Sequence, residues 1–141
     1  MKKVYEQELM YTDAVSCNCG CGKTIKDKEI LSTLRDLSEC LYNSLPINVY
    51  KAKIIFYITS WTRCERHNKE VGGAVNSLHM EGKAIDFVVA VEFGNDEILI
   101  PAEMTAFLLN AMAPDKNEII TYEKGRVHLG LRDLRFRLNK K

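Results

Sequence analysis

The residues of this chain best suited to chemistry are His79 and Asp86, close together in sequence, and His128 in a later apolar run. Two imidazoles and one carboxylate from separate segments form the ligand set of a catalytic zinc site, which leaves its fourth position open for water. An isolated histidine is more often an ordinary loop or strand residue. The segments around these three residues favour the metal site.

Three short motifs lie next to the candidate ligands. The patterns are S-x-x-R over residues 60–63, H-N-x-x-V-G-G-A over residues 67–74 and S-x-H-x-x-G-x-A-x-D over residues 77–86. Over residues 15–137 the chain resembles the zinc D-alanyl-D-alanine carboxypeptidase family, which includes the L-alanyl-D-glutamate endopeptidases of phage endolysins. The resemblance implies one bound zinc ion, a hedgehog/DD-peptidase-like fold and a substrate that is the peptide of bacterial peptidoglycan.

The same resemblance assigns roles to individual residues. It makes His79, Asp86 and His128 the zinc ligands, and it turns Arg63 toward the substrate. A guanidinium at that place suits a developing oxyanion or a substrate carboxylate, because it stays charged and donates two parallel hydrogen bonds. Its alternative role is a surface ion pair. Ser77 could bind substrate or cap the loop before His79.

The general base is less clear from the sequence. Well-known family members carry an acidic residue three positions before the last histidine, where this chain has Gly125; relatives often have Asp two positions after it, where this chain has Gly130. A hairpin with Lys124-Gly125 as a two-residue turn would pair Glu123 with Arg126 and bring Glu123 to the sheet face of His128. Glu123 is therefore the expected base, with a surface pair to Arg126 as its alternative and Glu81 as a weaker candidate.

The bulk properties are those of a globular protein. The chain has 141 residues, enough for one domain over 1–141 that buries about two thirds of its unfolded surface in a single core. Its net charge of +1 gives no broad electrostatic reason to expect nucleic acid as a partner. Basic residues are frequent in the last ten positions, which predicts a solvated C-terminal end or weak binding to anionic wall polymer or membrane.

The start of the chain contains no apolar run of the kind that a secretion signal needs, and no window is apolar enough for a membrane span. We therefore expect a monomer made in the cytoplasm, which acts on the cell wall after release or export by another protein. Phage lysins are released from the cytoplasm by other proteins in this way.

Hydrophobic patterns predict the elements that position the site. Residues 27–45 have the spacing of an amphipathic helix capped by Asp27 and ended by Pro46, and residues 64–71 suit a short polar helix. A third helix begins at Pro101. Buried strands are expected over 53–59 and 84–91, and a hairpin over 118–131 after a Pro114-Asp115 turn. This uneven mixture predicts an α+β fold, with a small antiparallel sheet carrying helices on one side.

Five cysteines complete the inventory. Cys17, Cys19 and Cys21 form a C-x-C-x-C run, and Cys40 and Cys64 stand apart. An odd number in a chain without an export signal favours free thiols. A second metal site is the less favoured interpretation, because the gaps of one residue are shorter than those of zinc knuckles and no histidine lies near.

Together these observations predict a zinc peptidase that cuts peptide bonds in the stem or cross-links of peptidoglycan, as a DD-carboxypeptidase or an L-Ala-D-Glu endopeptidase. The alternative is a phage or cell-wall recognition module that keeps the metal and has lost the base. The glycines at the usual acid positions favour the alternative, and the three ligands with Arg63 favour the enzyme.

Overall fold

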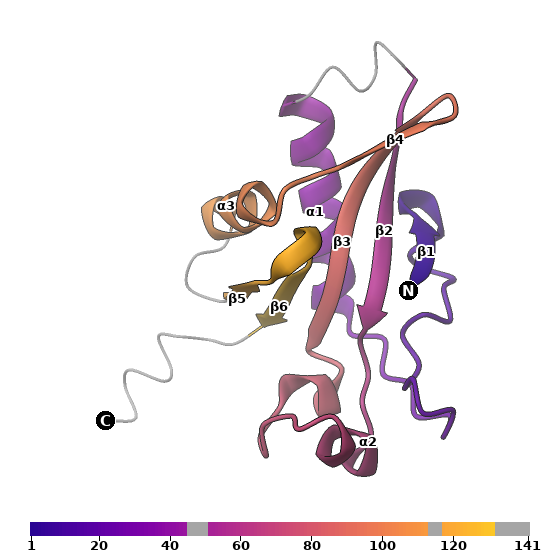
Figure 1. Cartoon of the computed structure of the whole chain (residues 1–141), viewed down its shortest axis with the longest axis vertical. Coiled ribbons are helices and arrows are strands. Elements are labelled where there is room, and N and C mark those ends of the chain that lie inside the picture. The colour runs from indigo at the N-terminus through magenta and orange to yellow at the C-terminus, as the bar shows by residue number, and fades with distance from the viewer. Residues whose placement is uncertain (45–50, 113–116, 132–141) are drawn as a thin grey trace.

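An antiparallel sheet supports the candidate site (Figure 1). The computed structural model describes residues 1–44, 51–112 and 117–131. Within these ranges the sheet has the order β1-β2-β3-β6-β5, and β4 also pairs with β3. The strands are β1 (Lys2–Tyr5), β2 (Lys53–Ser60), β3 (Ala84–Phe93), β4 (Asp96–Leu99), β5 (Asn117–Thr121) and β6 (Val127–Leu131).

The long strand β3 organises the sheet. One of its edges pairs with β2, and the other is shared by β6, which pairs with residues 84–87, and β4, which pairs with residues 90–93. This pairing sets Asp86 opposite His128 on one side and opposite Ser60 on the other. The register between β2 and β3 shifts between Ile58 and Ser60, an irregularity of the kind that re-aims side chains near sites.

Two helices cover one face of the sheet, α1 (Lys28–Ser44) and α3 (Ala102–Met112), as the sequence predicts (Figure 1). Alternate strand residues point into this layer because side chains of a strand alternate between faces. Asp27 caps α1 as expected, its carboxylate accepting hydrogen bonds from the backbone of Glu29 at 2.9 Å and Ile30 at 3.1 Å. The core contains Leu34, Leu37, Ile54, Phe56, Ile85, Phe87, Val127 and Leu129, all at most 1% exposed.

The short elements lie outside this two-layer core. The helix α2 (Glu65–Glu70) and the 3-10 turn η2 (Leu78–Glu81) pack at one end of the sheet, while η1 (Glu6–Glu8) follows β1 and η3 (Glu123–Gly125) joins β5 to β6. Among the described residues, no helix combines the length and the apolar character that crossing a bilayer requires.

The predicted helices and central strands are confirmed. The strands β1 and β4 were not predicted, because both are short and lie at edges of the sheet. Pro46 and the Pro114-Asp115 turn fall outside the described residues.

The predicted hairpin turn is wrong. Its turn has three residues, Glu123 to Gly125, and Tyr122 donates a hydrogen bond to the Arg126 carbonyl at 2.8 Å. Lys124 adopts a left-handed conformation with φ 61°, so the loop accommodates one residue more than the two-residue turn would.

Gly82 fixes the end of η2 against the preceding loop. Its φ is +71°, and an added Cβ would lie 2.5 Å from the Ile25 carbonyl oxygen. Its own carbonyl accepts a 2.9 Å hydrogen bond from the indole of Trp61, a fully buried side chain. The turn that presents His79 therefore leaves no room for a side chain at residue 82.

We expect Gly82→Ala to destabilise the protein more than Gly72→Ala. Gly72 has the same φ of +71°, and no atom lies within 4 Å of an added Cβ. Gly72→Ala therefore measures only the cost of placing alanine in a left-handed conformation, about 1–2 kcal/mol. Gly82→Ala adds overpacking, which costs about 1–3 kcal/mol more. Urea unfolding of both variants measures the difference, and equal losses would contradict the close approach to Ile25.

Candidate metal centre

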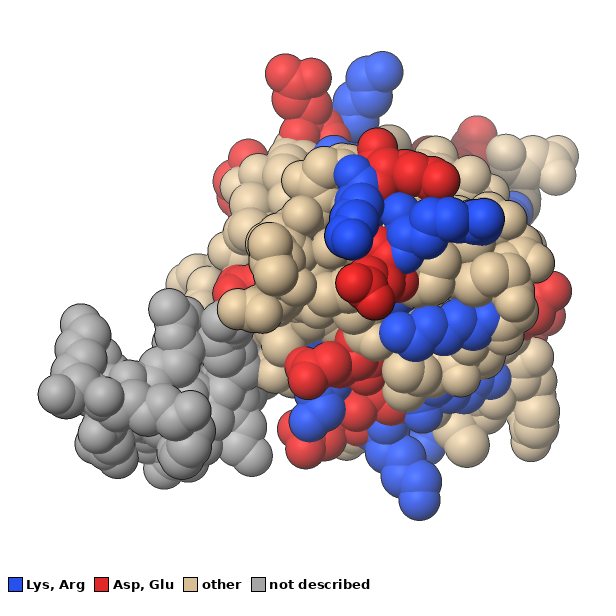
Figure 2. All heavy atoms as spheres, turned by 90° about the horizontal axis from the view of Figure 1, so that it is seen from below, with Lys and Arg blue, Asp and Glu red and all other residues tan. Residues whose placement is uncertain are grey.

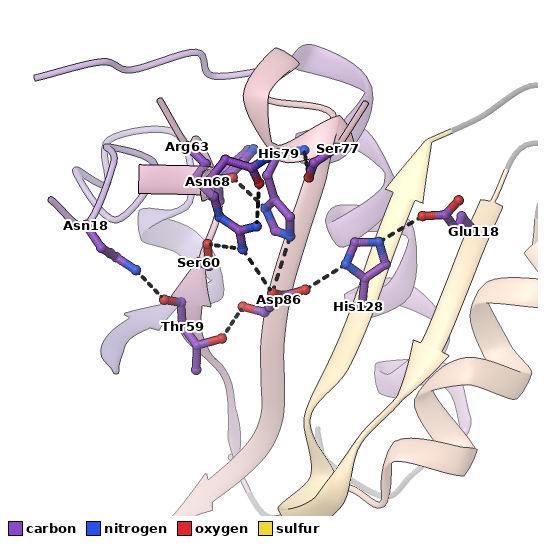
Figure 3. A network of polar contacts seen from close by, with 11 residues as sticks. Asn18, Thr59, Ser60, Arg63, Asn68, Ser77, His79, Asp86, Glu118 and His128 are labelled. Carbon is purple, nitrogen blue, oxygen red and sulfur yellow. Dashed lines mark hydrogen bonds and ion pairs between the residues drawn. The ribbon is translucent and has the colours of Figure 1, made fainter. Parts of the chain in front are cut away.

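Three segments bring their predicted ligands together at one end of the sheet (Figure 3). His79 comes from η2, Asp86 from β3 and His128 from β6. One ligand atom from each lies within 4.8 Å of the others. Both histidines are buried, and the Asp86 side chain is 15% exposed. The cluster is thus nearly enclosed, with its carboxylate in the middle.

The imidazole of His79 has one nitrogen committed to the backbone. Its Nδ1 lies 2.7 Å from the Trp61 carbonyl oxygen, which can only accept, so Nδ1 carries the hydrogen. The other ring nitrogen, Nε2, lies 3.3 Å from Asp86 Oδ2, and it would offer its lone pair to a metal once it carries no hydrogen. A fixed tautomer with its free nitrogen in the cluster is how proteins prepare a metal-binding histidine.

His128 lies between two carboxylates. Its Nδ1 is 2.8 Å from Asp86 Oδ1, and its Nε2 is 3.2 Å from Glu118 Oε1. Burial by itself lowers the pKa of His128, but the hydrogen bonds and charges of Asp86 and Glu118 outweigh it and raise that pKa. Without a metal, the ring therefore holds its second proton to a higher pH than a free imidazole does.

Asp86 is surrounded by cationic groups. Burial by itself raises the pKa of its carboxyl, yet hydrogen bonds from His128 and His79 and their charges hold that pKa well below its usual range. Arg63 adds a guanidinium nitrogen 3.9 Å from Oδ2. The carboxylate is consequently ionised at any pH at which the protein works, as a metal ligand must be.

The donor set fits a zinc ion. Zinc bound at about 2.0–2.1 Å to nitrogen or oxygen in a tetrahedron separates its ligand atoms by about 3.3 Å. The Asp86 oxygens lie 3.3 Å from His79 Nε2 and 2.8 Å from His128 Nδ1, so small side-chain shifts would admit the ion. On this reading the metal replaces the proton of His128 Nδ1, and Nε2 keeps its hydrogen bond to Glu118.

Arg63 is held beside the cluster by neutral partners. One terminal nitrogen donates to Asn68 Oδ1 at 3.1 Å and the other to Ser60 Oγ at 3.2 Å. Its backbone N–H donates to the His79 carbonyl at 2.9 Å, which ties its loop to η2. The Nε atom is buried and has no hydrogen-bond partner among the described residues. This donor of the cation is therefore unsatisfied among the described residues.

The other residues of the three motifs have local structural roles. Ser77 caps η2, its hydroxyl accepting from the His79 backbone at 3.3 Å. Asn68 also donates to the Ala74 carbonyl at 2.8 Å, so it braces the turn after α2 as well as Arg63. His67 lies in α2, with Nδ1 3.7 Å from Glu70.

The observed hairpin register changes which glutamate meets the metal cluster. The position diagonal to His128, where the two-residue turn would put Glu123, is occupied by Tyr122, and Glu123 is exposed in η3 beside a hollow lined by Tyr57 and Val88. A slip of one residue moves every side chain to the other face of a strand. On the opposite diagonal, Glu118 reaches His128 instead.

Gly130 makes room for Leu78, and Glu118 lies beside it at an ordinary contact distance. Glu118 pairs with Gly130 across the ladder, and a Cβ at residue 130 would lie 3.4 Å from Glu118 Oε1 and 2.8 Å from a methyl of Leu78. The sequence analysis missed Glu118 because it assumed a two-residue turn. A three-residue turn ending in glycine would have placed Glu118 on the face of His128.

Charges of both signs mix on the surface at this end of the molecule. Viewed from the α2 end, lysine and arginine side chains alternate with aspartate and glutamate over the described residues in sight (Figure 2). Such a surface lacks the continuous positive field that a nucleic-acid backbone attracts. The absence of a nucleic-acid partner stays a prediction.

Comparison with known families matches the chain to the peptidase M15 model over residues 8–107. The chain belongs to the peptidase M15 family. This match confirms the resemblance based on the three motifs. The M15 peptidases are zinc-dependent metallopeptidases. The matched range includes His79 and Asp86, while His128 lies beyond it. No curated protein and no solved structure gives a significant match.

We expect His128→Ala to remove one equivalent of zinc per chain from the purified M15 protein, since a two-ligand remnant holds zinc weakly. His67→Ala is the matched control, because it removes the one histidine outside the cluster. Elemental analysis by mass spectrometry gives the ratio of zinc to protein. Unchanged zinc in His128→Ala, or an equal loss in His67→Ala, would contradict the assignment.

Acidification should weaken metal binding through His128. Its pKa lies above the ordinary 6.5, so below that pKa a proton occupies the nitrogen that the metal needs, and affinity falls with falling pH. NMR titration of the metal-free protein should give a His128 midpoint above 6.5. The Asp86→Asn substitution should lower that midpoint by about one unit or more, because it removes the main opposing charge. A midpoint that is the same in both proteins would contradict this electrostatic description.

Proposed function

We propose that this protein is a zinc peptidase that hydrolyses peptide bonds in the stem or cross-links of bacterial peptidoglycan, acting as a DD-carboxypeptidase or an L-Ala-D-Glu endopeptidase. The observation that carries the proposal is the convergence of His79, Asp86 and His128 in an M15 chain. The motifs shared with D-alanyl-D-alanine carboxypeptidases support the substrate class.

The ligand set leaves room for catalysis. A zinc ion held by three protein ligands supplies a Lewis acid with an open position for water and the scissile carbonyl. The protein's own contribution is orientation: the Trp61 carbonyl fixes the ring of His79, and Glu118 fixes the ring of His128. The buried ligands also reduce the water around the site, which strengthens the electrostatic interactions within it.

Arg63 would bind the charge that the substrate brings or develops. Asn68 and Ser60 hold its guanidinium in place before substrate arrives, so little ordering is needed on binding. The Arg63 side chain is 12% exposed, and a substrate carboxylate or oxyanion oxygen would meet this exposed part. Ser77 contributes by capping η2 and remains a candidate contact for substrate.

We assign proton transfer to Glu118, whose side chain would have to turn from His128 Nε2 toward the attacking water, because Nε2 faces away from the metal cluster. Hydrolysis needs a carboxylate that takes a proton from the attacking water and passes it to the leaving amine. Among the described residues, Glu118 is the glutamate that contacts the cluster, and its side chain is 32% exposed at the open edge. It reaches past Gly130, the position where relatives often have Asp, so it replaces that acid from the neighbouring strand.

Digestion of purified peptidoglycan by the zinc-loaded protein tests the proposal, with released fragments identified by mass spectrometry. Glu118→Gln should keep the zinc and lower turnover by roughly a hundredfold or more, because the amide still accepts a hydrogen bond from His128 and cannot carry the proton. Glu123→Gln is the matched control and should keep full activity.

Other outcomes would change the assignment. Full activity in Glu118→Gln would limit Glu118 to holding His128, and loss of activity in Glu123→Gln would restore Glu123 as the base. Retained zinc and peptidoglycan binding without any released fragment would favour the recognition module. That alternative is supported by the glycines at positions 125 and 130.

A further inference from the structure

A second group of metal-binding side chains lies outside the site described above. Cys17, Cys19 and Cys21 in the N-terminal loop meet Cys64, which caps α2, and their four sulfur atoms lie within 4.8 Å of one another. The sequence showed the C-x-C-x-C run, and the fold adds the fourth donor from 45 positions beyond Cys19. The whole group thus supplies a complete tetrahedral ligand set.

The sulfur spacing is that of a metal shell. Cys17 Sγ lies 3.4 Å from Cys19 Sγ, and Cys19 Sγ lies 3.6 Å from Cys64 Sγ. A disulfide would require about 2.0 Å. Four thiolates bound to zinc at about 2.3 Å are separated from one another by about 3.8 Å. All five cysteines of the chain are free, as the sequence analysis expected.

Backbone amides already point at the sulfurs. Cys17 Sγ accepts from the Cys64 N–H at 3.4 Å, Cys64 Sγ from the His67 N–H at 3.3 Å, and Cys21 Sγ from the Lys23 N–H at 3.4 Å. Donors of this kind stabilise thiolate charge and orient metal ligands.

The loop is also closed by its own backbone. Cys17 donates to the Lys23 carbonyl at 2.9 Å, and Gly20 donates to the Cys17 carbonyl at 3.2 Å. These turns allow three cysteines separated by single residues to converge, which removes the objection that their spacing is too short.

We propose that Cys17, Cys19, Cys21 and Cys64 bind a second zinc ion, in a structural site. Four thiolates leave no open position, so this site would do no hydrolysis. Its effect would be to fasten the N-terminal loop to the segment that carries Arg63, where the Thr62 N–H already donates to the Val15 carbonyl at 3.0 Å. Cys21 is exposed and Cys17 is buried, so the ion would lie at the surface edge of the loop.

Cobalt substitution tests this proposal on the 141-residue chain. Cobalt bound to thiolates gives a sulfur-to-metal charge-transfer absorption, which histidine and carboxylate ligands do not give. The band should appear in the wild type and in His128→Ala, vanish in the double variant Cys19→Ser with Cys64→Ser, and persist in Cys40→Ser, the control that changes the remaining cysteine. Zinc content should fall from two equivalents per chain to one in the double variant.

A measurement on the unmodified protein covers the case in which the double variant fails to fold. In the folded, zinc-loaded protein, zinc should protect four of the five thiols from a thiol reagent and leave one reactive. After a chelator removes the zinc, all five thiols should react. No charge-transfer band, or a thiol reactivity that zinc does not change, would overturn the proposal. Because neither readout depends on hydrolysis, this proposal and the proposed peptidase activity can fail independently.

Discussion

Burying a carboxylate in a sheet costs several kcal/mol unless cations or hydrogen-bond donors surround it, and Asp86 has three such groups within 4 Å. His79, His128 and Arg63 come from three different segments, so the carboxylate is satisfied only when β2, β3, β6 and η2 are all in place (Figure 3). In the metal-free protein, the hydrogen bond from His128 Nδ1 and the charge of Arg63 stabilise the Asp86 carboxylate. A zinc ion would take over that role, which couples metal binding to the folded arrangement of this end of the sheet.

The loop from Ser60 to Cys64 lies between the two clusters. Trp61 holds His79 through its carbonyl and Gly82 through its indole, while Arg63 faces Asp86. Cys64 then belongs to the cysteine cluster on the other side. If both clusters bind metal, the position of Arg63 is fixed from two directions, and one of them is a structural site that takes no part in hydrolysis.

The sequence predicted the parts of this site whose residues are close together or follow a regular pattern. His79 and Asp86 share one motif, and the structure places them side by side. The buried strands and α1 follow from apolar spacing and are confirmed. The glutamate beside His128 could not be predicted, because a single extra residue in the turn exchanges Glu123 for Glu118. The cysteine cluster was hidden for another reason: Cys64 joins the run at Cys17 to Cys21 only through tertiary structure.

Anomalous diffraction at the zinc absorption edge, from crystals grown with zinc, tests whether His79, Asp86 and His128 form a zinc site. We predict a peak bounded by His79 Nε2, the Asp86 carboxylate and His128 Nδ1, with Glu118 still on His128 Nε2. No peak among these three side chains in zinc-saturated crystals would contradict it.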